Sequence, residues 1–304
     1  MKIAITPGDP DGIGPEVTKK ALARIQKKYK NQVSFLIIGN KEKLKGLSKN
    51  HSILAAPNTS SYFVPGFQAG WSIEVAAKLC LSGECAAMVT GPISKERLQK
   101  GGYHFNGHTD MLAAITQTKK VTMMLLNQHL RVALVTTHLA LSAVSMSMSK
   151  EAISETIKQV YDGLKNLFGV KKPRIAILAL NPHAGEAGLF GNEEIHIIVP
   201  AIDQKHSFGP FPADTFFALE MNKPKTKRFD AVVGMYHDQV LIPVKMLDFS
   251  KTVNLTLGLP IIRTSVDHGT AFDIAGKNRA NPDSMVAAIE LAIDLARRKR
   301  KEKT

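Results

Sequence analysis

The sequence has little cysteine and no long apolar run. Among its 304 residues only Cys80 and Cys85 are cysteines, which excludes a framework of disulfide bonds and favours a reducing compartment. No apolar stretch approaches the roughly 18 residues that a membrane-spanning helix needs. The opening segment lacks the apolar core of a signal peptide, because Pro7 and Gly8 interrupt it. We therefore expect a soluble, cytoplasmic protein without a membrane partner.

Acidic residues are also in deficit. Lys and Arg number 40 against 26 Asp and Glu, which gives a formal net charge of +14. Much of the excess lies in the last eight residues, Arg297–Thr304, and aromatic residues are not interleaved with the lysines as on a nucleic-acid-binding surface. We interpret this end as a solvated helix terminus and expect no nucleic-acid partner, although the charge alone suggests that alternative. A basic surface also attracts anionic substrates.

Short apolar runs rich in Val, Ile and Ala alternate with amphipathic stretches along the chain. Runs without strict polar–apolar alternation are typical of strands buried on both faces, and their alternation with helices predicts an α/β fold with a mostly parallel sheet. Strands are predicted at Lys2–Thr6, Val33–Gly39, Ala86–Thr90, Val121–Leu126, Arg131–Thr136, Arg174–Leu180, Ala231–Met235 and Ile261–Thr264. Helices are predicted from Pro15 and at Ser72–Leu81, Thr109–Thr116, Lys150–Leu167, Glu193–Asp203, Ala213–Glu220 and Pro282–Arg298. Asn50–Gly66 has no clear period, and we interpret it as irregular surface structure.

Three histidines each come just after a predicted strand. They are His138, His183 and His237. Because reactive groups in such folds gather at the carboxyl ends of the strands, the three imidazoles can converge at one edge of the sheet. Three histidines with an open coordination position suit Lewis-acid catalysis by a divalent metal such as Zn²⁺, Co²⁺ or Mg²⁺. The pattern favours this site over three isolated histidines that each make a hydrogen bond.

Two aspartates lie near these histidines or in a neighbouring loop. Asp238 follows His237 directly, and Asp214 lies in the segment Pro212–Thr215. Either carboxylate could fix the tautomer of a metal-binding imidazole. For Asp214, capping the start of a helix is an equally good explanation.

A second group of residues suits an anion. A helix is predicted to begin near His108 and Thr109, whose backbone N–H groups, imidazole and hydroxyl can bind a phosphate or carboxylate. Lys245, Asn254 and Arg263 add polar and cationic groups in the late loops. Arg263 is the most telling of these residues, because an unpaired cation in or near a buried strand is costly.

The first loop, Gly8–Glu16, joins a strand to a helix. Its glycines allow a ligand to approach the backbone closely, and Pro15 suits a first helical turn. The spacing differs from G-x-G-x-x-G, so a Rossmann dinucleotide fold is unsupported. A tight turn and a cofactor contact both remain open for this loop.

Long motifs are spread over nearly the whole chain: Gly8–Glu16, Gly91–Lys95, Gly107–Asp110, Thr136–Leu141, Asn181–Glu186, Pro212–Thr215, Tyr236–Gln239, Val253–Pro260 and Arg263–Gly269. Together they resemble the 4-hydroxythreonine-4-phosphate dehydrogenase family of vitamin B6 biosynthesis. The segments Pro7–Glu16 and His268–Lys277 also resemble the wider class of isocitrate and isopropylmalate dehydrogenases. Asp11 and Asp110 depart from the Ala and Glu that are usual in the family.

The resemblance implies two α/β/α subdomains with the active site in the cleft between them, and a homodimer with a shared active site. Residues 1–118 with 247–304 would form the cofactor side, and residues 119–246 would bind the metal and dimerise. A non-Rossmann site would bind NAD or NADP. Its residues would be Asp9, Gly12, His268, Gly269, Ala271 and Asn281.

The resemblance also implies a reaction: oxidation of 4-phosphooxy-L-threonine at C3 by NAD(P)⁺, followed by loss of CO₂ to give 3-amino-2-oxopropyl phosphate. The metal would be bound by His138, His183 and His237, with ligands shared between dimer partners. The substrate, a phosphorylated hydroxy amino acid, would contact His108, Thr109, Lys245, Asn254 and Arg263. Asp238 or a metal-bound water would take the hydroxyl proton. A dehydrogenase of a phosphorylated threonate and a metal-dependent phosphate-ester hydrolase are the alternatives.

Overall fold

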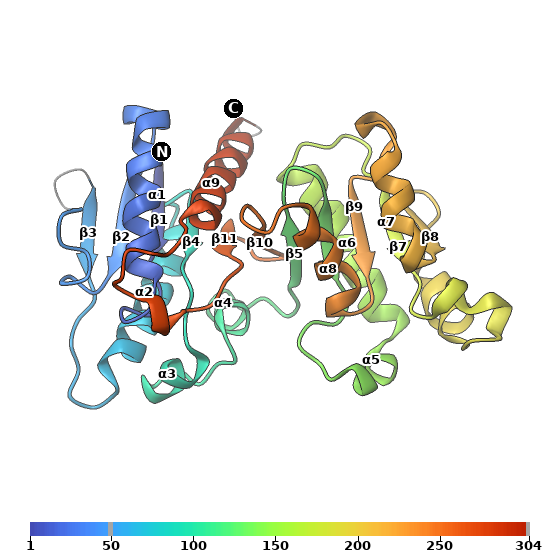
Figure 1. Cartoon of the computed structure of the whole chain (residues 1–304), viewed down its shortest axis with the longest axis horizontal. Helices are drawn as coiled ribbons and strands as arrows, with labels where there is room; N and C mark the ends of the chain where they lie inside the picture. Colours follow the sequence, from blue (N-terminus) through green and yellow to red (C-terminus); the bar gives the residue numbers. More distant parts are fainter. Residues whose placement is uncertain (48–50, 302–304) are drawn as a thin grey trace. The chain divides into compact units, whose positions relative to one another are not determined.

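The computed structural model of the chain describes residues 1–47 and 51–301. The chain divides into unit 1, Met1–Val121 with Ser250–Thr304, and unit 2, Thr122–Phe249 (Figure 1). The boundaries that the sequence predicts after residues 118 and 246 lie three residues before those of the units. Asn50 of the predicted irregular segment and residues 302–304 of the basic end lie outside the described residues. None of the described helices combines the length and apolarity needed to cross a membrane.

Unit 1 contains a sheet with the strand order β3-β2-β1-β4-β11-β10. All neighbours in it are parallel except β10, which is antiparallel to β11. The strands are β1 (Lys2–Thr6), β2 (Ser34–Gly39), β3 (Ser52–Ala55), β4 (Ala87–Thr90), β10 (Val253–Leu257) and β11 (Arg263–Val266). The helices are α1 (Gly14–Tyr29), α2 (Val64–Leu81), α3 (Lys95–Lys100), α4 (His108–Ile115) and α9 (Asp283–Lys301), with 3₁₀ turns at Lys30–Gln32 and Phe272–Ile274.

Helices cover both faces of this sheet. Ile73 of α2 and Leu112 of α4 share a buried cluster with Ala4 of β1 and Met88 of β4, which defines one face. On the other face α9 packs against β11, β4 and β10, with α1 beside it. Every residue of β4 and β11 is buried. The expectation of strands buried on both faces is therefore confirmed in unit 1.

Unit 2 contains strands in the order β5-β6-β9-β7-β8. Here β5 is antiparallel to β6, and the remaining neighbours are parallel. The strands are β5 (Thr122–Leu126), β6 (Arg131–Leu134), β7 (Ile175–Leu178), β8 (Ser207–Phe211) and β9 (Ala231–Gly234). The helices are α5 (Leu141–Ser147), α6 (Lys150–Asn166), α7 (Ala213–Asn222) and α8 (His237–Leu247), with short turns at Pro182–Gly188, Glu194–Ile198, Val199–Ala201 and Lys225–Lys227.

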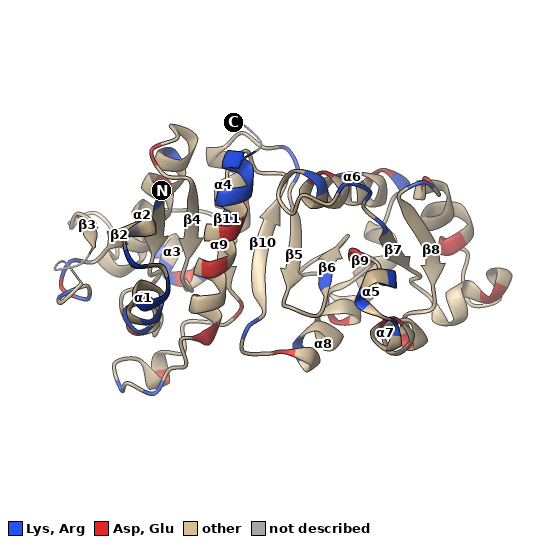
Figure 2. Cartoon of the chain, turned by 90° about the horizontal axis from the view of Figure 1, so that it is seen from above, with Lys and Arg blue, Asp and Glu red and all other residues tan. Residues whose placement is uncertain are grey.

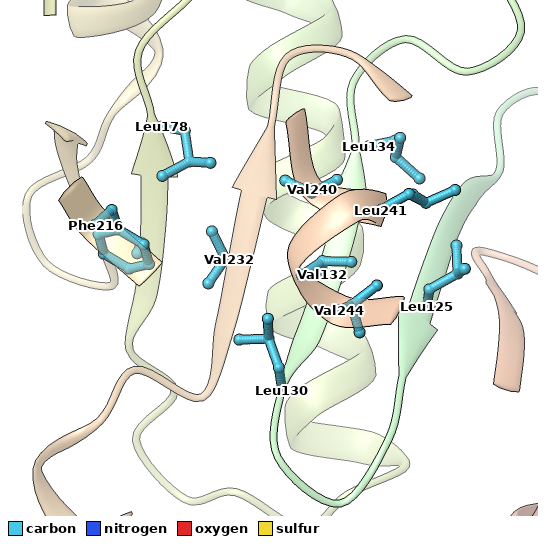
Figure 3. Close-up of a cluster of buried hydrophobic side chains, with 11 residues drawn as sticks. Leu125, Leu130, Val132, Leu134, Leu178, Phe216, Val232, Val240, Leu241 and Val244 are labelled. Carbon is cyan, nitrogen blue, oxygen red and sulfur yellow. The ribbon is translucent and has the colours of Figure 1, made fainter. Parts of the chain in front are cut away.

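The core of unit 2 fixes the strands that carry the candidate metal ligands. Val132 of β6 and Val232 of β9 pack beneath Val240 and Val244 of α8, with Phe216 of α7 at the side of the cluster (Figure 3). Each such side chain contributes about 1.5–3 kcal/mol when it is fully buried. Because α8 begins directly at His237, this core also fixes the start of that helix.

The structure corrects several expectations. The predicted helix Glu193–Asp203 is confirmed only in part: the segment is helical up to Ala201, but as one π turn followed by one 3₁₀ turn, and Ile202 is already extended. Pro200 has no backbone N–H to donate within a regular α-helix. Asn50–Gly66 is not irregular throughout, since it contains β3 and the first residues of α2. The sequence does not predict that α2 begins as early as Val64, because Gly66 is a poor helix former. A Cβ on Gly66 would lie 1.7 Å from the carbonyl oxygen of Arg97, so glycine is there for close packing.

Candidate active site

The carboxyl ends of β6 and β9 bring two of the predicted metal ligands together. Thr136 donates two hydrogen bonds to the carbonyl oxygen of Met235, from its backbone N–H at 3.2 Å and its Oγ1 at 2.6 Å. This joins the two strand ends, and the ring centroids of His138 and His237 lie 5.7 Å apart. Nδ1 of His237 lies 2.7 Å from Oδ1 of Asp238. A carboxylate on Nδ1 fixes the tautomer that leaves Nε2 available to a metal.

His183 is exposed and lies in the turn that follows β7, where its ring contacts Phe190 at a centroid distance of 6.2 Å. Within residues 1–47 and 51–301, no three His, Cys, Asp or Glu side chains of the single chain form a metal-binding group. One chain thus pairs two of the three histidines. The convergence of all three stays a prediction.

Asp214 is exposed in the first turn of α7. The capping explanation for this residue is wrong, because Pro212 occupies the N-cap position and no side chain caps the helix. Lys245 lies in the last turn of α8, with its Nζ 5.6 Å from the ring centroid of Phe249.

Arg263 is a buried cation in unit 1. Its side chain is held by hydroxyl groups: Nε and one terminal nitrogen donate to Oγ1 of Thr90 at 3.1 and 2.7 Å, and the other donates to Oγ1 of Thr256 at 3.0 Å. No ion pair of Arg263 with a carboxylate is found in the described part of the chain. Burial lowers the pKa of Arg263 to about 9, which leaves the guanidinium charged at neutral pH. A buried charge without a counter-charge is costly, so the site favours an anionic ligand.

Two further side chains of unit 1 each have one buried polar atom without a hydrogen bond in the described part of the chain. Burial, and then the Arg263 charge, hold the pKa of His108 well below its usual range, against an opposing hydrogen bond with the Gly91 backbone. The two buried atoms are Nε2 of His108 and Oδ1 of Asn254, for which residues 1–47 and 51–301 supply no hydrogen-bond partner. His108 is also the first residue of α4 and Thr109 the second, where backbone N–H groups have no partner within the helix. The arrangement can bind a phosphate or carboxylate.

The two stretches predicted to bind the cofactor pack against each other. The backbone N–H of Ile13 donates to the carbonyl oxygen of Thr270 at 2.9 Å, and a Cβ on Gly12 would lie 2.9 Å from that same oxygen. The Glu16 carboxylate accepts hydrogen bonds from the backbone N–H groups of Asn278 and Ala280 at 3.2 and 3.0 Å. Residues of both stretches line a cavity of about 440 Å³.

Asp9 lies at the centre of this region, with 1% of its surface exposed. Its Oδ1 accepts hydrogen bonds from the backbone N–H of Asp11 and from Arg97, whereas Oδ2 is buried and has no partner among the residues that the structure describes. Burial raises the pKa of Asp9, and this outweighs the opposing effects of the Asp11 N–H and the Arg97 charge. Arg97 also pairs with Asp11 at 2.9 Å and lies 4.3 Å from the ring centroid of Phe272. It therefore links the two stretches, a role that we did not anticipate although the motif Gly91–Lys95 ends just before it.

The remaining cofactor candidates have distinct local roles. Nδ1 of His268 lies 3.0 Å from the carbonyl oxygen of Gly269, and its buried Nε2 has no partner within the described ranges of the chain. Ala271 has a left-handed backbone with a φ of 41°. Oδ1 of Asn281 accepts a hydrogen bond from the N–H of Asp283 at the start of α9. The side chain of Asn281 thus has a structural role at the start of α9.

The amino-acid sequence matches the family model of the pyridoxal phosphate biosynthetic protein PdxA over residues 19–292. A 4-hydroxythreonine-4-phosphate dehydrogenase of Trichlorobacter lovleyi is 43% identical over 331 aligned positions, which cover 97% of each chain. A relative in Bradyrhizobium diazoefficiens, provisionally named a D-threonate 4-phosphate dehydrogenase, is 41% identical and covers 97% of this chain and 96% of its own.

Solved structures of related proteins have the same fold as this chain. A 4-hydroxythreonine-4-phosphate dehydrogenase of Klebsiella pneumoniae superposes with a TM-score of 0.84 at 36% identity, covering 97% of this chain and 98% of its own. An isocitrate dehydrogenase of Methylococcus capsulatus, 15% identical, has a TM-score of 0.54 over 99% of this chain and 88% of its own, which confirms the predicted fold class. The resemblance found in the motifs is confirmed as well: the chain belongs to the PdxA family of pyridoxal phosphate biosynthetic proteins.

Proposed function

We propose that this protein is an NAD(P)-dependent dehydrogenase that oxidises and decarboxylates 4-phosphooxy-L-threonine in pyridoxal phosphate biosynthesis. The observation that carries the proposal is the buried guanidinium of Arg263, which is held by two threonine hydroxyls and pairs with no carboxylate of the described residues. A phosphate or carboxylate of the substrate would supply the missing charge. The relatives named as dehydrogenases of phosphorylated substrates support this choice.

The anion site would orient the substrate. Neutral His108 directs its one ring N–H at the Gly91 backbone, so its buried Nε2 would accept a hydrogen bond from a substrate hydroxyl or a protonated phosphate oxygen. Thr109 adds its hydroxyl and backbone N–H at the start of α4. Asn254 offers the unpartnered Oδ1 to a substrate hydroxyl or ammonium. We propose Lys245 of unit 2 as a further contact. Fixing one end of the substrate in this way holds the reacting carbon in a defined place and lowers the entropic part of the barrier.

The donor set at the ends of β6 and β9 fits a divalent metal, since two imidazoles lie close together and one has its Nδ1 on a carboxylate. We propose that His183 of a second copy completes the set. A metal bound there would polarise the substrate hydroxyl and stabilise the charge that develops as CO₂ leaves. Asp238 would hold the His237 tautomer. Asp238 and Asp214 are our candidates for moving the hydroxyl proton.

The nicotinamide cofactor, NAD or NADP, would bind in unit 1 along the two packed stretches. This proposal rests on two buried atoms, Oδ2 of Asp9 and Nε2 of His268, which have no partner in the described residues. It also rests on Gly12, which lets the two stretches pack closely. Gly269 and Ala271 would shape the backbone there, and Asn281 would act through the start of α9. Both cysteines are free thiols, which agrees with the proposed cytoplasmic location.

A homodimer is the assembly that we propose, through unit 2. Large apolar side chains of this unit are exposed on α5 and α7 and in the turns around His183. They include Leu141 (73% exposed), Met146 (91%), Leu189 (74%), Phe190 (48%) and Leu219 (64%). Exposed apolar residues gathered on one unit mark an interaction site. Figure 2 shows Lys and Arg as well as Asp and Glu along the ribbons of both units. We propose no nucleic-acid partner.

The test is an assay of NAD(P)⁺ reduction, followed by the absorbance of the reduced nicotinamide. We expect turnover with 4-phosphooxy-L-threonine, its loss after chelation, and its return with Zn²⁺ or Co²⁺. In Arg263→Met the apparent substrate KM should rise about 10- to 100-fold, because a charged hydrogen bond contributes about 1.5–3 kcal/mol. Phosphate release without cofactor reduction would instead show a hydrolase.

A second candidate, a dehydrogenase of phosphorylated threonate, is favoured by one relative's name. The same assay with D-threonate 4-phosphate separates the two functions. A higher kcat/KM for the threonate than for the amino acid would overturn our choice of substrate and retain the reaction type.

A further inference from the structure

The segment that carries His183 has an unusual backbone. From His183 to Ala187 five consecutive residues have positive φ, at 52°, 54°, 80°, 45° and 54°, and only Gly185 among them is a glycine. L-residues avoid this left-handed region, because Cβ approaches the following carbonyl oxygen. Such a run persists only where its surroundings enforce it.

The surroundings contain a buried carboxylate, Glu194, with 2% of its surface exposed. Its Oε1 accepts hydrogen bonds from the backbone N–H groups of Leu180 and Asn181, both at 2.8 Å. Its Oε2 accepts from Nδ2 of Asn181 at 2.9 Å. No Lys, Arg or His forms an ion pair with Glu194 in the described part of the chain, so backbone and amide N–H groups alone hold this charge.

Glu194 also touches the left-handed run itself. A Cβ added to Gly185 would lie 2.7 Å from Oε2 of Glu194, so carboxylate and backbone are in direct contact. The neighbouring Glu193 extends the network, since it accepts hydrogen bonds from Nδ2 of Asn181 at 2.8 Å and from Oγ of Ser145 at 2.6 Å. The end of β7, the His183 segment and α5 are thus joined through two adjacent carboxylates.

We propose that Glu194 is a positioning residue, which fixes the backbone between β7 and the left-handed run so that the His183 imidazole is presented for metal binding. The metal part of this inference rests on the proposed function. The backbone part does not, and it can be measured on the protein without metal.

The experiment compares the full-length wild type with Glu194→Ala, Glu194→Gln and Glu220→Gln. Glu220 is a matched control: it is 1% exposed, accepts a hydrogen bond from the backbone N–H of Phe229, and pairs with Lys223 at 2.7 Å. It acts at the amino end of β9, whereas the histidines follow the carboxyl ends of the strands. The readouts are hydrogen–deuterium exchange of peptides covering 180–190 without metal, and Co²⁺ affinity from the visible absorption spectrum.

In Glu194→Ala we expect exchange in 180–190 to be at least about tenfold faster, and Co²⁺ affinity to fall by about 10- to 100-fold, as for other residues that orient a ligand. Glu194→Gln should show smaller changes in the same direction, because its amide oxygen still accepts both backbone N–H groups while its NH₂ faces Asn181. Glu220→Gln should match the wild type in both readouts.

The proposal would be overturned if residues 180–190 exchange at the wild-type rate in both Glu194 variants. It would also be overturned if Glu220→Gln accelerates their exchange as much as the Glu194 variants do. If Glu194→Ala fails to fold, Glu194→Gln decides the question. Wild-type protein that binds no Co²⁺ would contradict the proposed metal site, and the exchange measurement would still decide the role of Glu194.

Discussion

Two buried charges of unit 1, Arg263 and Asp9, are only partly neutralised by the protein. Among the residues that the structure describes, hydroxyl groups alone bind the guanidinium, and one oxygen of the carboxylate has no partner. Each arrangement lowers the stability of the empty protein, since charges removed from water need partners. This loss of stability is offset when a ligand supplies the missing partner, as we propose for the substrate at Arg263 and the cofactor at Asp9.

Asp9→Asn should stabilise the folded protein while weakening NAD(P) binding. Because the pKa of Asp9 is raised in the folded state, its ionised form at pH 7 costs folding free energy, and the variant should gain about 0.5–1 kcal/mol in free energy of unfolding. The gain should shrink as pH falls through the pKa of Asp9, because the wild type then takes up the proton. Urea unfolding of both proteins across pH checks this, and a gain that grows in acid would contradict it.

The loops after the strands are fixed to one another by close backbone contacts. Gly8, after β1, has a φ of 87°, and the next residue donates its N–H to the carbonyl oxygen of Pro92 at 2.9 Å. A Cβ on Gly8 would lie 2.0 Å from that oxygen. The loops that follow β1 and β4 can therefore approach this closely only with glycine at position 8.

Gly8→Ala should lower the free energy of unfolding by about 3 kcal/mol or more and weaken cofactor binding, because backbone strain and a collision with the backbone act together. Gly46→Ala is the matched control, since Gly46 has a φ of 91° but a Cβ added there would meet nothing within 4 Å. That variant should lose only about 1–2 kcal/mol, the cost of the left-handed backbone. Thermal and urea unfolding give both values, and equal losses would show that the contact with Pro92 is irrelevant.

The proximity of His138 and His237 follows from their positions at strand ends, which the sequence predicts. The side chains of His138 and His237 converge because their strands are neighbours, and the carboxyl ends of parallel neighbours share one edge. The position of His183 could not be predicted in the same way, since the backbone of its segment is left-handed and no residue pattern predicts a left-handed segment there. β10 was missed because Asn254 and Thr256 interrupt its apolar run, and these are residues that belong to the polar region around Arg263. The left-handed segment at His183 and the strand β10 are both determined by tertiary contacts and not by local propensity.

At the scale of the whole molecule, the two units differ in what they leave exposed. Unit 2 has exposed large apolar residues on α5, α7, α8 and the turns after β7, whereas those of unit 1 are fewer. Apolar surface of this kind is removed from water when a second copy binds, and symmetric dimers bury the same residues on both subunits. The proposed metal site would then be completed only in the dimer.

Met146→Lys combined with Leu141→Lys should turn the dimer into monomers and lower Co²⁺ affinity. Both side chains are exposed on α5, so the charges would be tolerated in a monomer and buried in the interface of a dimer. Leu81→Lys, at the end of α2 in unit 1, is the control and should leave the mass in sedimentation unchanged. A wild type that sediments as a monomer at micromolar concentration would contradict the assembly.

The guanidinium that lacks a carboxylate has a consequence for the life of the protein in a cell. Any ligand that binds only the native state shifts the folding equilibrium toward it, by about 2.7 kcal/mol at one hundred times its dissociation constant. Protein without a bound ligand would unfold more often and be degraded sooner than ligand-bound protein. The amount of enzyme would then rise with the concentration of the anion that binds Arg263.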